Sequence, residues 1–374
     1  MGKFAALSTE GDINRPIREL LGRMLEKELV SGVMIPARQP FQHTVMQTLI
    51  TDPAQLEAID PFAPVVPTNS AKPLAALTQR SSGRRVAAVL RSCEVRAFLE
   101  LVKLHQGSTD DLVLIGLDCL GRYEGRDYRA LAERDGDDLA LGFLKKNGAG
   151  GPEIAAACQA CVHPVPEAVD LRLCVIGADP AEVIHLEQVS ERGKEVFDAL
   201  GLEAADAPAG RDAAVEALKQ QRGAHREQHL GEFAERTKDL VGLSEAVATC
   251  INCYNCRVAC PVCYCKECVF VTDTMRHDGE QLLKWSRKRG RIKLPADTVF
   301  YHLTRMVHMS ALCVGCGQCT SACPNDVPVW ELLATVADRT QARFDYLPGR
   351  SLEEGQPMAV FYDGEFDEVT GQYK

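Results

Sequence analysis

The 374-residue chain lacks long hydrophobic runs, and only 6% of its residues are aromatic. It has no stretch of 18 apolar residues that could cross a membrane, and its opening residues, MGKFAALSTEGDIN, carry no secretory signal. It also has no Walker loop, Gly-x-Gly-x2-Gly turn or Ser-His-Asp set. The formal net charge of −10 argues against a nucleic-acid partner. We therefore expect a cytoplasmic protein with no direct membrane insertion.

Cysteine is abundant instead, with 16 residues in the chain. Eight of them form two copies of the spacing Cys-x2-Cys-x2-Cys-x3-Cys-Pro, which is typical of cubane [4Fe-4S] clusters. The first run is Cys250, Cys253, Cys256 and Cys260, and the second is Cys313, Cys316, Cys319 and Cys323. Three closely spaced thiolates can hold three corners of a cluster, whereas the fourth, before proline, is turned towards the neighbouring cluster.

The two runs therefore predict a crossed pair of clusters. We expect one cluster on Cys250, Cys253, Cys256 and Cys323, and the other on Cys313, Cys316, Cys319 and Cys260. Zinc is the alternative, because Cys-x2-Cys pairs also form tetrahedral zinc sites. The repetition of all four cysteines with the final Cys-Pro favours iron–sulfur clusters.

The first two thirds of the chain have the pattern of an α/β fold. Apolar runs at residues 86–90 and 112–116 have the length of strands, and a helical stripe at residues 95–102 separates them. Such a unit predicts two parallel strands. An amphipathic helix is expected from Pro16 onwards, followed by a short strand that ends at Pro36. We expect a mixed or parallel sheet with flanking helices.

Four further cysteines belong to this α/β part. Cys93 and Cys119 directly follow the two strands, so both should lie at the carboxyl edge of the sheet, where open α/β sheets bind ligands. Cys158 and Cys161 form a Cys-x2-Cys pair further along. The four thiols could converge on a third cluster, but an isolated cysteine is also often a small buried hydrophobic residue. The spacing alone leaves both interpretations open.

Three segments carry a family resemblance: VAAVLRSCEVRAFL at residues 86–99, IGLDC at 115–119 and CQAC at 158–161. They resemble the beta-subunit family of coenzyme F420-reducing hydrogenases and formate dehydrogenases, over roughly residues 12–205. The resemblance implies a cluster on Cys93, Cys119, Cys158 and Cys161 beside an FAD. The family's flavin loop corresponds to residues 69–73, which keep its serine but not its tyrosine. Its expected flavin contacts are Asn69, Ser70 and Lys72.

The 52 residues between Cys260 and Cys313 are too many for a compact ferredoxin, and they show helical patterns. One apolar stripe after Asp297 consists of Val299, Phe300, Leu303, Met306 and Val307. The phrase HMSALCVGCGQCTSACP at residues 308–324 resembles the α-helical ferredoxins of heterodisulfide reductase C subunits and succinate dehydrogenase iron–sulfur proteins. This resemblance implies an all-α dicluster ferredoxin domain.

We thus expect four parts: an α/β domain at residues 1–205, a helical linker at 206–240, the α-helical ferredoxin at 241–340, and a C-terminal arm at 341–374 that packs on a neighbouring subunit. Cys263, Cys265 and Cys268 would make a fourth set of four with Cys174; a fourth cluster, a ligand from a partner, redox thiols and loop packing are the alternatives. A basic patch lies between the runs: Lys284, Arg287, Lys288, Arg289, Arg291 and Lys293. It is either a solvated face or a docking surface for an acidic partner.

The leading interpretation is an iron–sulfur electron-transfer subunit of a multi-subunit oxidoreductase. The resemblance implies partner subunits of the hydrogenase, formate dehydrogenase or heterodisulfide-reductase kind. The alternative is a flavin-dependent dehydrogenase that oxidises coenzyme F420 or NAD(P)H directly. A zinc-organised interaction protein is the third interpretation.

Overall fold

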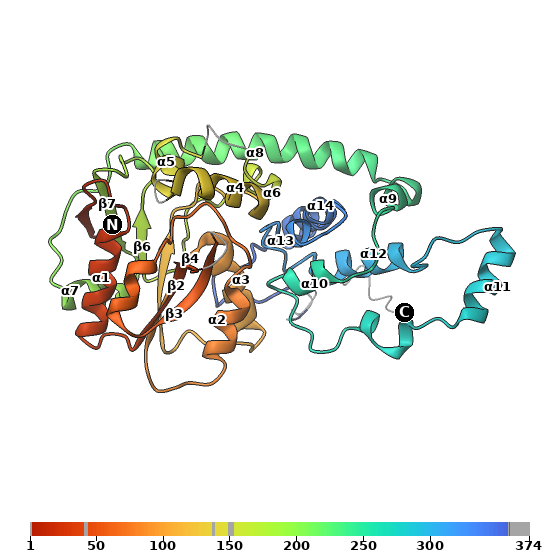
Figure 1. The fold of residues 1–374 in the computed structure, drawn as a ribbon, viewed down its shortest axis with the longest axis horizontal. Coiled ribbons are helices and arrows are strands. Elements are labelled where there is room, and N and C mark those ends of the chain that lie inside the picture. The colour runs from red at the N-terminus through yellow and green to blue at the C-terminus, as the bar shows by residue number, and fades with distance from the viewer. Residues whose placement is uncertain (1, 41–43, 137–138, 149–152, 358, 360–374) are drawn as a thin grey trace, which may run out of the picture.

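The computed structural model describes residues 2–40, 44–136, 139–148, 153–357 and 359. Within them, a seven-stranded mixed sheet lies beside a helix-rich C-terminal region (Figure 1). The strands are β1 (Phe4–Ser8), β2 (Gly32–Arg38), β3 (Val45–Ile50), β4 (Val86–Arg91), β5 (Leu112–Leu117), β6 (Leu171–Cys174) and β7 (Val183–Gln188), in the spatial order β1-β7-β6-β5-β4-β2-β3. The inner strands β2, β4, β5 and β6 are parallel, as the predicted strand–helix–strand unit requires, and the outer pairings are antiparallel.

Helices cover the sheet and then build the rest of the described chain. Those up to β7 are α1 (Arg15–Glu26), the 3-10 helix η1 (Pro53–Ala58), α2 (Ala71–Thr78), α3 (Ser92–Lys103), α4 (Gly125–Asp135), α5 (Leu139–Lys145) and α6 (Ala156–Gln159). After β7 come α7 (Glu191–Ala199), α8 (Arg211–Arg236), α9 (Leu240–Ala246), α10 (Asn255–Ala259), η3 (Val269–Val271), η4 (Asp273–Met275), α11 (Gly279–Arg289), α12 (Thr298–Met309), α13 (Gln318–Ser321) and α14 (Val329–Arg343). Among the described residues, no helix is both long enough and apolar enough to span a membrane.

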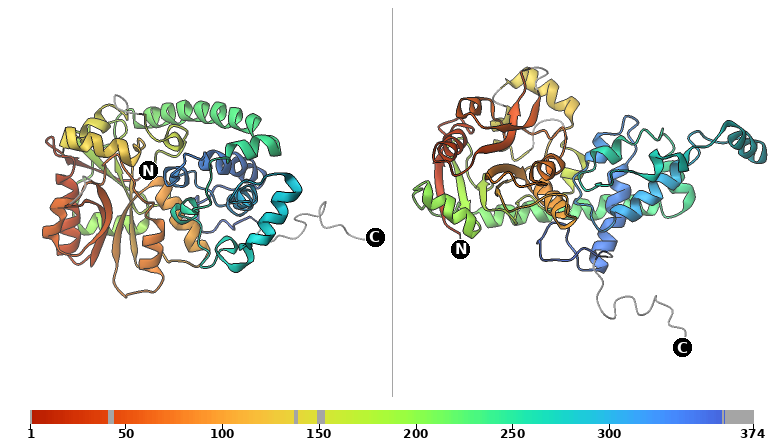
Figure 2. Two further views of the ribbon diagram at one scale, coloured as in Figure 1. Left: turned by 45° about the vertical axis from the view of Figure 1, so that its right-hand side comes forward. Right: turned by 90° about the horizontal axis from the view of Figure 1, so that it is seen from below.

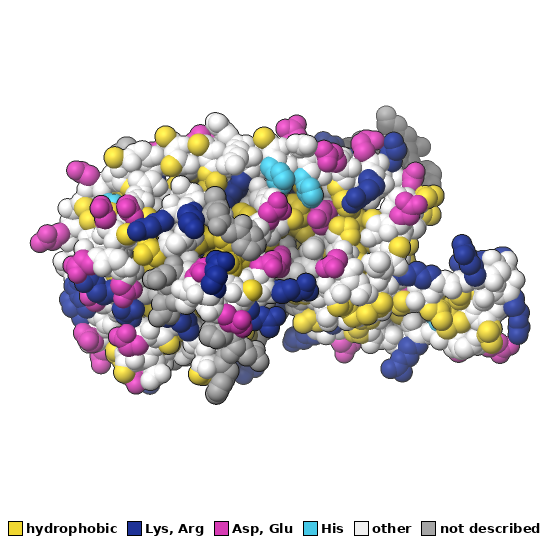
Figure 3. All heavy atoms as spheres, turned by 45° about the horizontal axis from the view of Figure 1, so that its top comes forward, with side chains coloured by type: hydrophobic (Ala, Val, Ile, Leu, Met, Phe, Trp, Pro, Cys, Tyr) yellow, Lys and Arg dark blue, Asp and Glu magenta, His cyan; other side chains and the backbone are white. Residues whose placement is uncertain are grey.

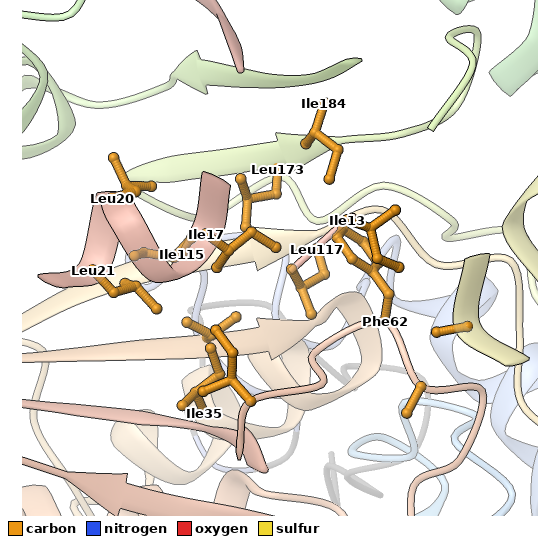
Figure 4. Packing of buried hydrophobic residues seen from close by; sticks show 14 of the residues in the cluster. Ile13, Ile17, Leu20, Leu21, Ile35, Phe62, Ile115, Leu117, Leu173 and Ile184 are labelled. Atoms are coloured by element: carbon orange, nitrogen blue, oxygen red, sulfur yellow. The ribbon is translucent and has the colours of Figure 1, made fainter. Parts of the chain in front are cut away.

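One hydrophobic core lies between α1 and the sheet. Ile17, Leu20 and Leu21 have the helical spacing that puts them on one face of α1, and this face packs against Ile115 of β5 and Leu173 of β6 (Figure 4). All five side chains are at most 3% exposed. Burying a large aliphatic side chain contributes about 1.5–3 kcal/mol, so this contact holds the helix on the sheet.

The predicted end of β2 at Pro36 is wrong, because the strand continues to Arg38. β2 pairs with β4 only through Gly32–Met34, so beyond Met34 no neighbour on that side requires a backbone N–H. On its other side, Pro36 lies opposite Gln47 of β3, a strand that the sequence reading missed. The proline carbonyl accepts a hydrogen bond from the backbone N–H of Asp60 at 2.9 Å.

A second core begins on the other face of the sheet and runs without a break into the helical region. It joins Leu90 of β4 and Phe98 of α3 to Tyr301 of α12 and Trp330 of α14. The 26-residue helix α8 extends over both parts (Figures 1 and 2). This helix falls in the predicted linker, and it contacts both α6 and α14.

The described part of the C-terminal arm packs on α3 of its own chain. The buried Glu100 carboxylate accepts hydrogen bonds from the Tyr346 hydroxyl (2.7 Å), the Gly349 backbone N–H (2.8 Å) and the Gln356 amide (2.8 Å). Residue 358 and residues 360–374 of the expected arm lie outside the described part. Residues 346–356 therefore pack on the α/β part of the same chain, whereas residues 341–343 are the end of α14 in the helical region.

Candidate metal centres

The first site combines thiols from both runs. One small cavity is lined by Cys250, Cys253, Cys256 and Cys323, which are the four cysteines predicted for the first cluster. The Cys250 thiol lies within electrostatic reach of both Cys256 and Cys323. Since Cys323 belongs to the second run, the fold produces the crossing that the Cys-Pro spacing indicates.

Hydrogen-bonding groups surround these thiols. His302 Nε2 lies 3.4 Å from Cys250 Sγ, and the Tyr301 hydroxyl lies 3.3 Å from Cys256 Sγ. Backbone N–H groups of Asn252 and Val327 donate to Cys250 and Cys323, each at 3.4 Å. Burial lowers the pKa of His302 to about 4, so its ring is neutral near pH 7. Both aromatic residues are on α12, whose buried face thus borders the site.

The second site is the reciprocal set. Cys260 of the first run lies within electrostatic reach of Cys313, Cys316 and Cys319. Cys260 and Cys319 are buried, at 7% and 6% exposure. Contacts between α10 and α13 bring the two runs together. These are the four residues predicted for the second cluster.

The third site lies at the carboxyl edge of the sheet, as the strand order predicts. Cys93 is in the first turn of α3 after β4, Cys119 follows β5, and Cys158 and Cys161 come from α6 and the residues after it. Cys93 interacts electrostatically with Cys119 and Cys161, and Cys158 interacts with the same two thiols. These four cysteines are far apart in the sequence but lie close together in the fold. This favours a shared cluster site over four separate buried cysteines.

The three sites form a connected series. Cys260 and Cys323 cross between the first and second sites, and Cys316 of the second lies within electrostatic reach of Cys93 of the third. Gly317 makes this approach close, because a Cβ there would fall well inside contact distance of Ala157, the residue before Cys158. Only glycine fits this position, which also has φ +73°.

Three buried arginines accompany the thiols, and the sequence reading missed all of them. Arg305 lies beside Cys256, Cys260 and Cys319; Arg122 lies beside Cys158 and Cys316; and Arg96 lies beside Cys93, Cys161 and Cys313. Their exposures are 5%, 4% and 8%. Arg96 and Arg122 each come three residues after a cysteine of the third site, Cys93 and Cys119, and this shared Cys-x2-Arg spacing is a local signal that could have identified them, whereas Arg305 has no such spacing.

The donor set fits iron–sulfur clusters bound through thiolates. Burial raises the pKa of Cys158 and Cys313 to about 11 and that of Cys316 to about 12, so without a bound cation these thiols would be neutral. Buried Nη1 of Arg305 has no hydrogen-bond partner in the described part of the chain. A buried guanidinium with one unpaired nitrogen beside three cysteines suits an anionic centre. No group of three or more His, Cys, Asp or Glu side chains in the described residues is arranged to hold a single metal ion.

The remaining four cysteines lie in two different parts of the fold. Cys174 is buried in β6, where its thiol lies 3.7 Å from the Arg172 carbonyl and from Glu187. Cys265 is exposed, and Cys263 lies within electrostatic reach of Cys260, Cys265 and Lys72. Cys268 interacts with Tyr254, near the first site. The sheet thus gives Cys174 surroundings of its own, and a fourth cluster, a ligand from a partner, redox thiols and loop packing all stay predictions for the other three cysteines.

The three residues expected to contact a flavin make contacts within the chain. The Ser70 hydroxyl donates to Glu94 at 2.6 Å, and Asn69 Oδ1 accepts from the Ala71 backbone at 3.0 Å. Lys72 Nζ donates to the carbonyl of Val258 in the helical region at 3.1 Å. The hydroxyl and the ammonium are thus engaged, so the fold adds no support to a flavin site at these residues.

The paired runs and their helical setting define an iron–sulfur protein of the dicluster kind. Residues 246–327 match the family model of the 4Fe-4S dicluster domain. This match confirms the prediction of [4Fe-4S] clusters in the helix-rich region.

The chain is also similar along most of its length to known redox subunits. It is 24% identical over 367 residues to the F420-dependent formate dehydrogenase subunit beta of Methanocaldococcus jannaschii, covering 89% of this chain and 91% of that protein. It is 24% identical over 392 residues to the F420-dependent formate dehydrogenase 1 subunit beta of Methanococcus maripaludis, covering 95% of each. These similarities confirm the beta-subunit resemblance seen in the sequence.

One solved structure completes the comparison. A chain of the F420-reducing [NiFe] hydrogenase complex from Methanosarcina barkeri aligns with 15% identity and a TM-score of 0.47. The alignment covers 64% of this chain and 95% of the hydrogenase chain.

Proposed function

We propose that this protein is the iron–sulfur electron-transfer subunit of a multi-subunit oxidoreductase of the F420-dependent formate dehydrogenase type. It would hold three [4Fe-4S] clusters, two in the α-helical ferredoxin at residues 241–340 and one at the sheet edge of the α/β domain at residues 1–205. The connected series of sites, with Cys316 beside Cys93, is the observation that carries the proposal.

The clusters would supply single-electron transfer. The chain's own residues place and tune them. The thiols hold each site, His302 and Tyr301 lie at hydrogen-bond distance from ligand sulfurs, and the buried arginines add positive charge. The names of the relatives support formate dehydrogenase partner subunits, because the similarity spans nine tenths of the chain.

A direct flavin-dependent dehydrogenase is the second candidate. A cavity of about 620 Å³ lies between α4 and the second run, and it is lined by Arg122, Arg126, Arg129 and Cys323, among others. The three arginines share the lining with Glu124, Asp127 and Asp326, so the cavity is polar without an excess of positive charge, and Cys323 would place a redox cofactor or substrate bound there near the first site. This cavity, rather than residues 69–72, is where we place the candidate site.

The experiment is to measure iron, zinc and flavin content, with the absorption spectrum, for the anaerobically purified chain. We expect about twelve irons per chain and a broad absorption that dithionite bleaches. A Cys93→Ser variant should lose about four irons and retain the rest, because only the third site loses a ligand. Zinc without iron would refute the proposal, and stoichiometric flavin would favour the dehydrogenase.

A further inference from the structure

Exposed hydrophobic side chains are concentrated in one part of the molecule. Of the 16 large ones among the described residues, 12 lie within residues 240–307: Leu240, Val241, Ile251, Val258, Tyr264, Val269, Val271, Leu283, Leu294, Phe300, Leu303 and Val307. Figure 3 shows hydrophobic side chains in a band that runs from the body of the molecule towards its protruding end. Apolar surface gathered in this way marks an interaction site.

The outward face of α12 forms the centre of this surface. Phe300, Leu303 and Val307 lie on one side of the helix and are 54%, 39% and 68% exposed. We call these three residues the outer stripe. The opposite side carries the buried Tyr301 and His302 beside the first site. The apolar spacing of the outer stripe predicts the buried side of an amphipathic helix, but in the structure this side faces the surface.

Helix α11 and its connections, residues 276–296, protrude from the body of the molecule (Figure 2). From here on, we call this segment the arm, as distinct from the C-terminal arm at residues 341–374. Both ends of the helix are capped. At the N-terminus, the Asp278 carboxylate accepts a hydrogen bond from the Gln281 backbone N–H at 2.7 Å, and at the C-terminus Gly290 follows with φ +76°. Yet no residue of α11 is buried, and Leu283 is 55% exposed. An 11-residue helix is marginal alone in water, so this arm is built to pack against another surface.

Charge indicates the nature of that surface. Residues 279–293 contain six Lys or Arg side chains and one Glu, in a chain with a net charge of −10. Within the described residues, Lys284, Arg287, Lys288, Arg289 and Arg291 have no ion pair. A partner with carboxylates around an apolar face would complement both features.

The root of the arm lies at the first site. Lys293 Nζ donates to the Cys250 carbonyl at 2.9 Å, and the Asn252 amide donates to Asp297 at 2.9 Å. Cys253 is exposed. A protein that covers the outer stripe and the arm would therefore cover the most accessible of the three sites.

We propose that the arm and the outer stripe dock a redox subunit of the same complex, through an apolar face on that subunit rimmed by Asp and Glu. This inference rests on the proposed function and deepens it, since it makes the first site the point of electron exchange with that subunit. A redox protein is favoured over a membrane because Cys253 of the first site is exposed in the same region, and a cluster ligand at the surface suits electron exchange with a partner.

The test uses the complex purified anaerobically through a tag on this chain. The arm variant combines Lys284→Glu, Arg287→Glu and Lys288→Glu, and its matched control combines Arg80→Glu, Arg84→Glu and Arg85→Glu on the exposed loop before β4. A second variant, the stripe variant, combines Leu303→Ser and Val307→Ser. Its matched control combines Leu49→Ser and Leu77→Ser, which are exposed leucines outside the proposed surface. Native mass spectrometry measures the retained redox subunit. We expect about a tenfold loss of it in the arm and stripe variants, and none in the controls.

A photo-crosslinking amino acid at Val307 identifies the occupant directly. We expect crosslinks to a sequenced, carboxylate-bearing segment of the retained subunit. Crosslinks to a second copy of this chain or to residues 360–374, binding of the arm to anionic phospholipid vesicles, or unchanged retention would each overturn the docking proposal. Iron content separates the two proposals, because a chain with full iron and no docking refutes only this one, whereas a chain without iron refutes the proposed function.

Discussion

Single buried arginines are the residues that most directly affect the chemistry of these sites. Arg305 faces thiols from both runs and donates to the Cys256 carbonyl at 3.3 Å, while its Nη1 has no partner among the described residues. A buried cation without a carboxylate is unfavourable in a folded protein unless another anionic group lies beside it. Thiolate-bound clusters would supply that negative charge.

We expect Arg305→Gln to lower the midpoint potential of the second cluster by roughly 50–150 mV, because a nearby positive charge favours the reduced, more negative state. Arg305→Lys retains the charge and should shift the potential much less. Redox titration followed by electron paramagnetic resonance measures both. Equal potentials in the two variants would show that Arg305 acts through packing alone.

Gly317 tests whether the second and third sites must approach so closely. Gly317→Ala should destabilise the protein by about 2–4 kcal/mol, through left-handed backbone strain and a clash with Ala157. Gly315→Ala is the matched control. It has the same φ of +73°, but its nearest neighbour is the Trp330 indole at 3.9 Å, so only the strain of about 1–2 kcal/mol applies. Denaturant unfolding measures both, and equal losses would contradict the close approach.

At the scale of elements, helix α8 connects the α/β part to the helical region, and a different ion pair holds it at each of these two parts. Its first residue, Arg211, forms a buried ion pair with Asp118 (Nη2 to Oδ1, 2.8 Å), which also accepts the backbone N–H groups of Val175 and Ile176. Towards its other end, Arg226 bonds Asp338 of α14 at 2.5 and 2.9 Å. The helix thus ties the residue before Cys119 to the helical region.

Asp118→Ala should therefore destabilise the protein by about 3–5 kcal/mol, since it leaves the Arg211 guanidinium and two backbone donors buried without a partner. Lys238→Ala removes one partner of the exposed pair with Glu235 and should change stability by less than about 1 kcal/mol. Chemical denaturation compares the two variants. Similar losses would mean that the Asp118 pair does not anchor α8.

At the scale of the whole molecule, the two cores differ in what they are made of. The first contains aliphatic and aromatic side chains between the sheet and its helices. The second extends into the helical region, where Cys256, Cys260 and Cys319 are among its buried members. The cysteines that we propose as cluster ligands therefore occupy positions that large hydrophobic residues fill elsewhere, so we expect the folding of this part to depend on bound iron.

Removing iron with a chelator under oxidising conditions should make the backbone amides of α10, α12 and α13 exchange their hydrogens faster. The amides of α1 and β7 should keep most of their protection from exchange, because the buried residues of these two elements belong to the first core, which contains no cysteine. Reconstitution with iron and sulfide should restore the original pattern. Uniform loss across the molecule, or no loss in the helical region, would contradict this division.

Local patterns in the sequence were sufficient for several features. The repeated Cys-Pro runs predict [4Fe-4S] clusters, which the dicluster match confirms. The apolar runs predict β4 and β5, because strands of a central parallel sheet are continuously hydrophobic. The long stripe of α1 predicts its buried face. In each case the determining interactions lie within a few residues.

Tertiary structure alone decided the rest, because the deciding contacts join residues far apart in the chain. Sequence spacing suggests that the apolar stripe of α12 faces the core, but packing on the two runs buries the more polar side instead. Tyr301, His302 and Arg305 are therefore turned inward, and Phe300 is turned outward. The meeting of Cys316 with Cys93 depends on the packing of the helical region against the sheet edge. The sequence by itself determined that the helix-rich region binds [4Fe-4S] clusters, and the fold determined which distant cysteines lie close together, because those contacts join separate elements.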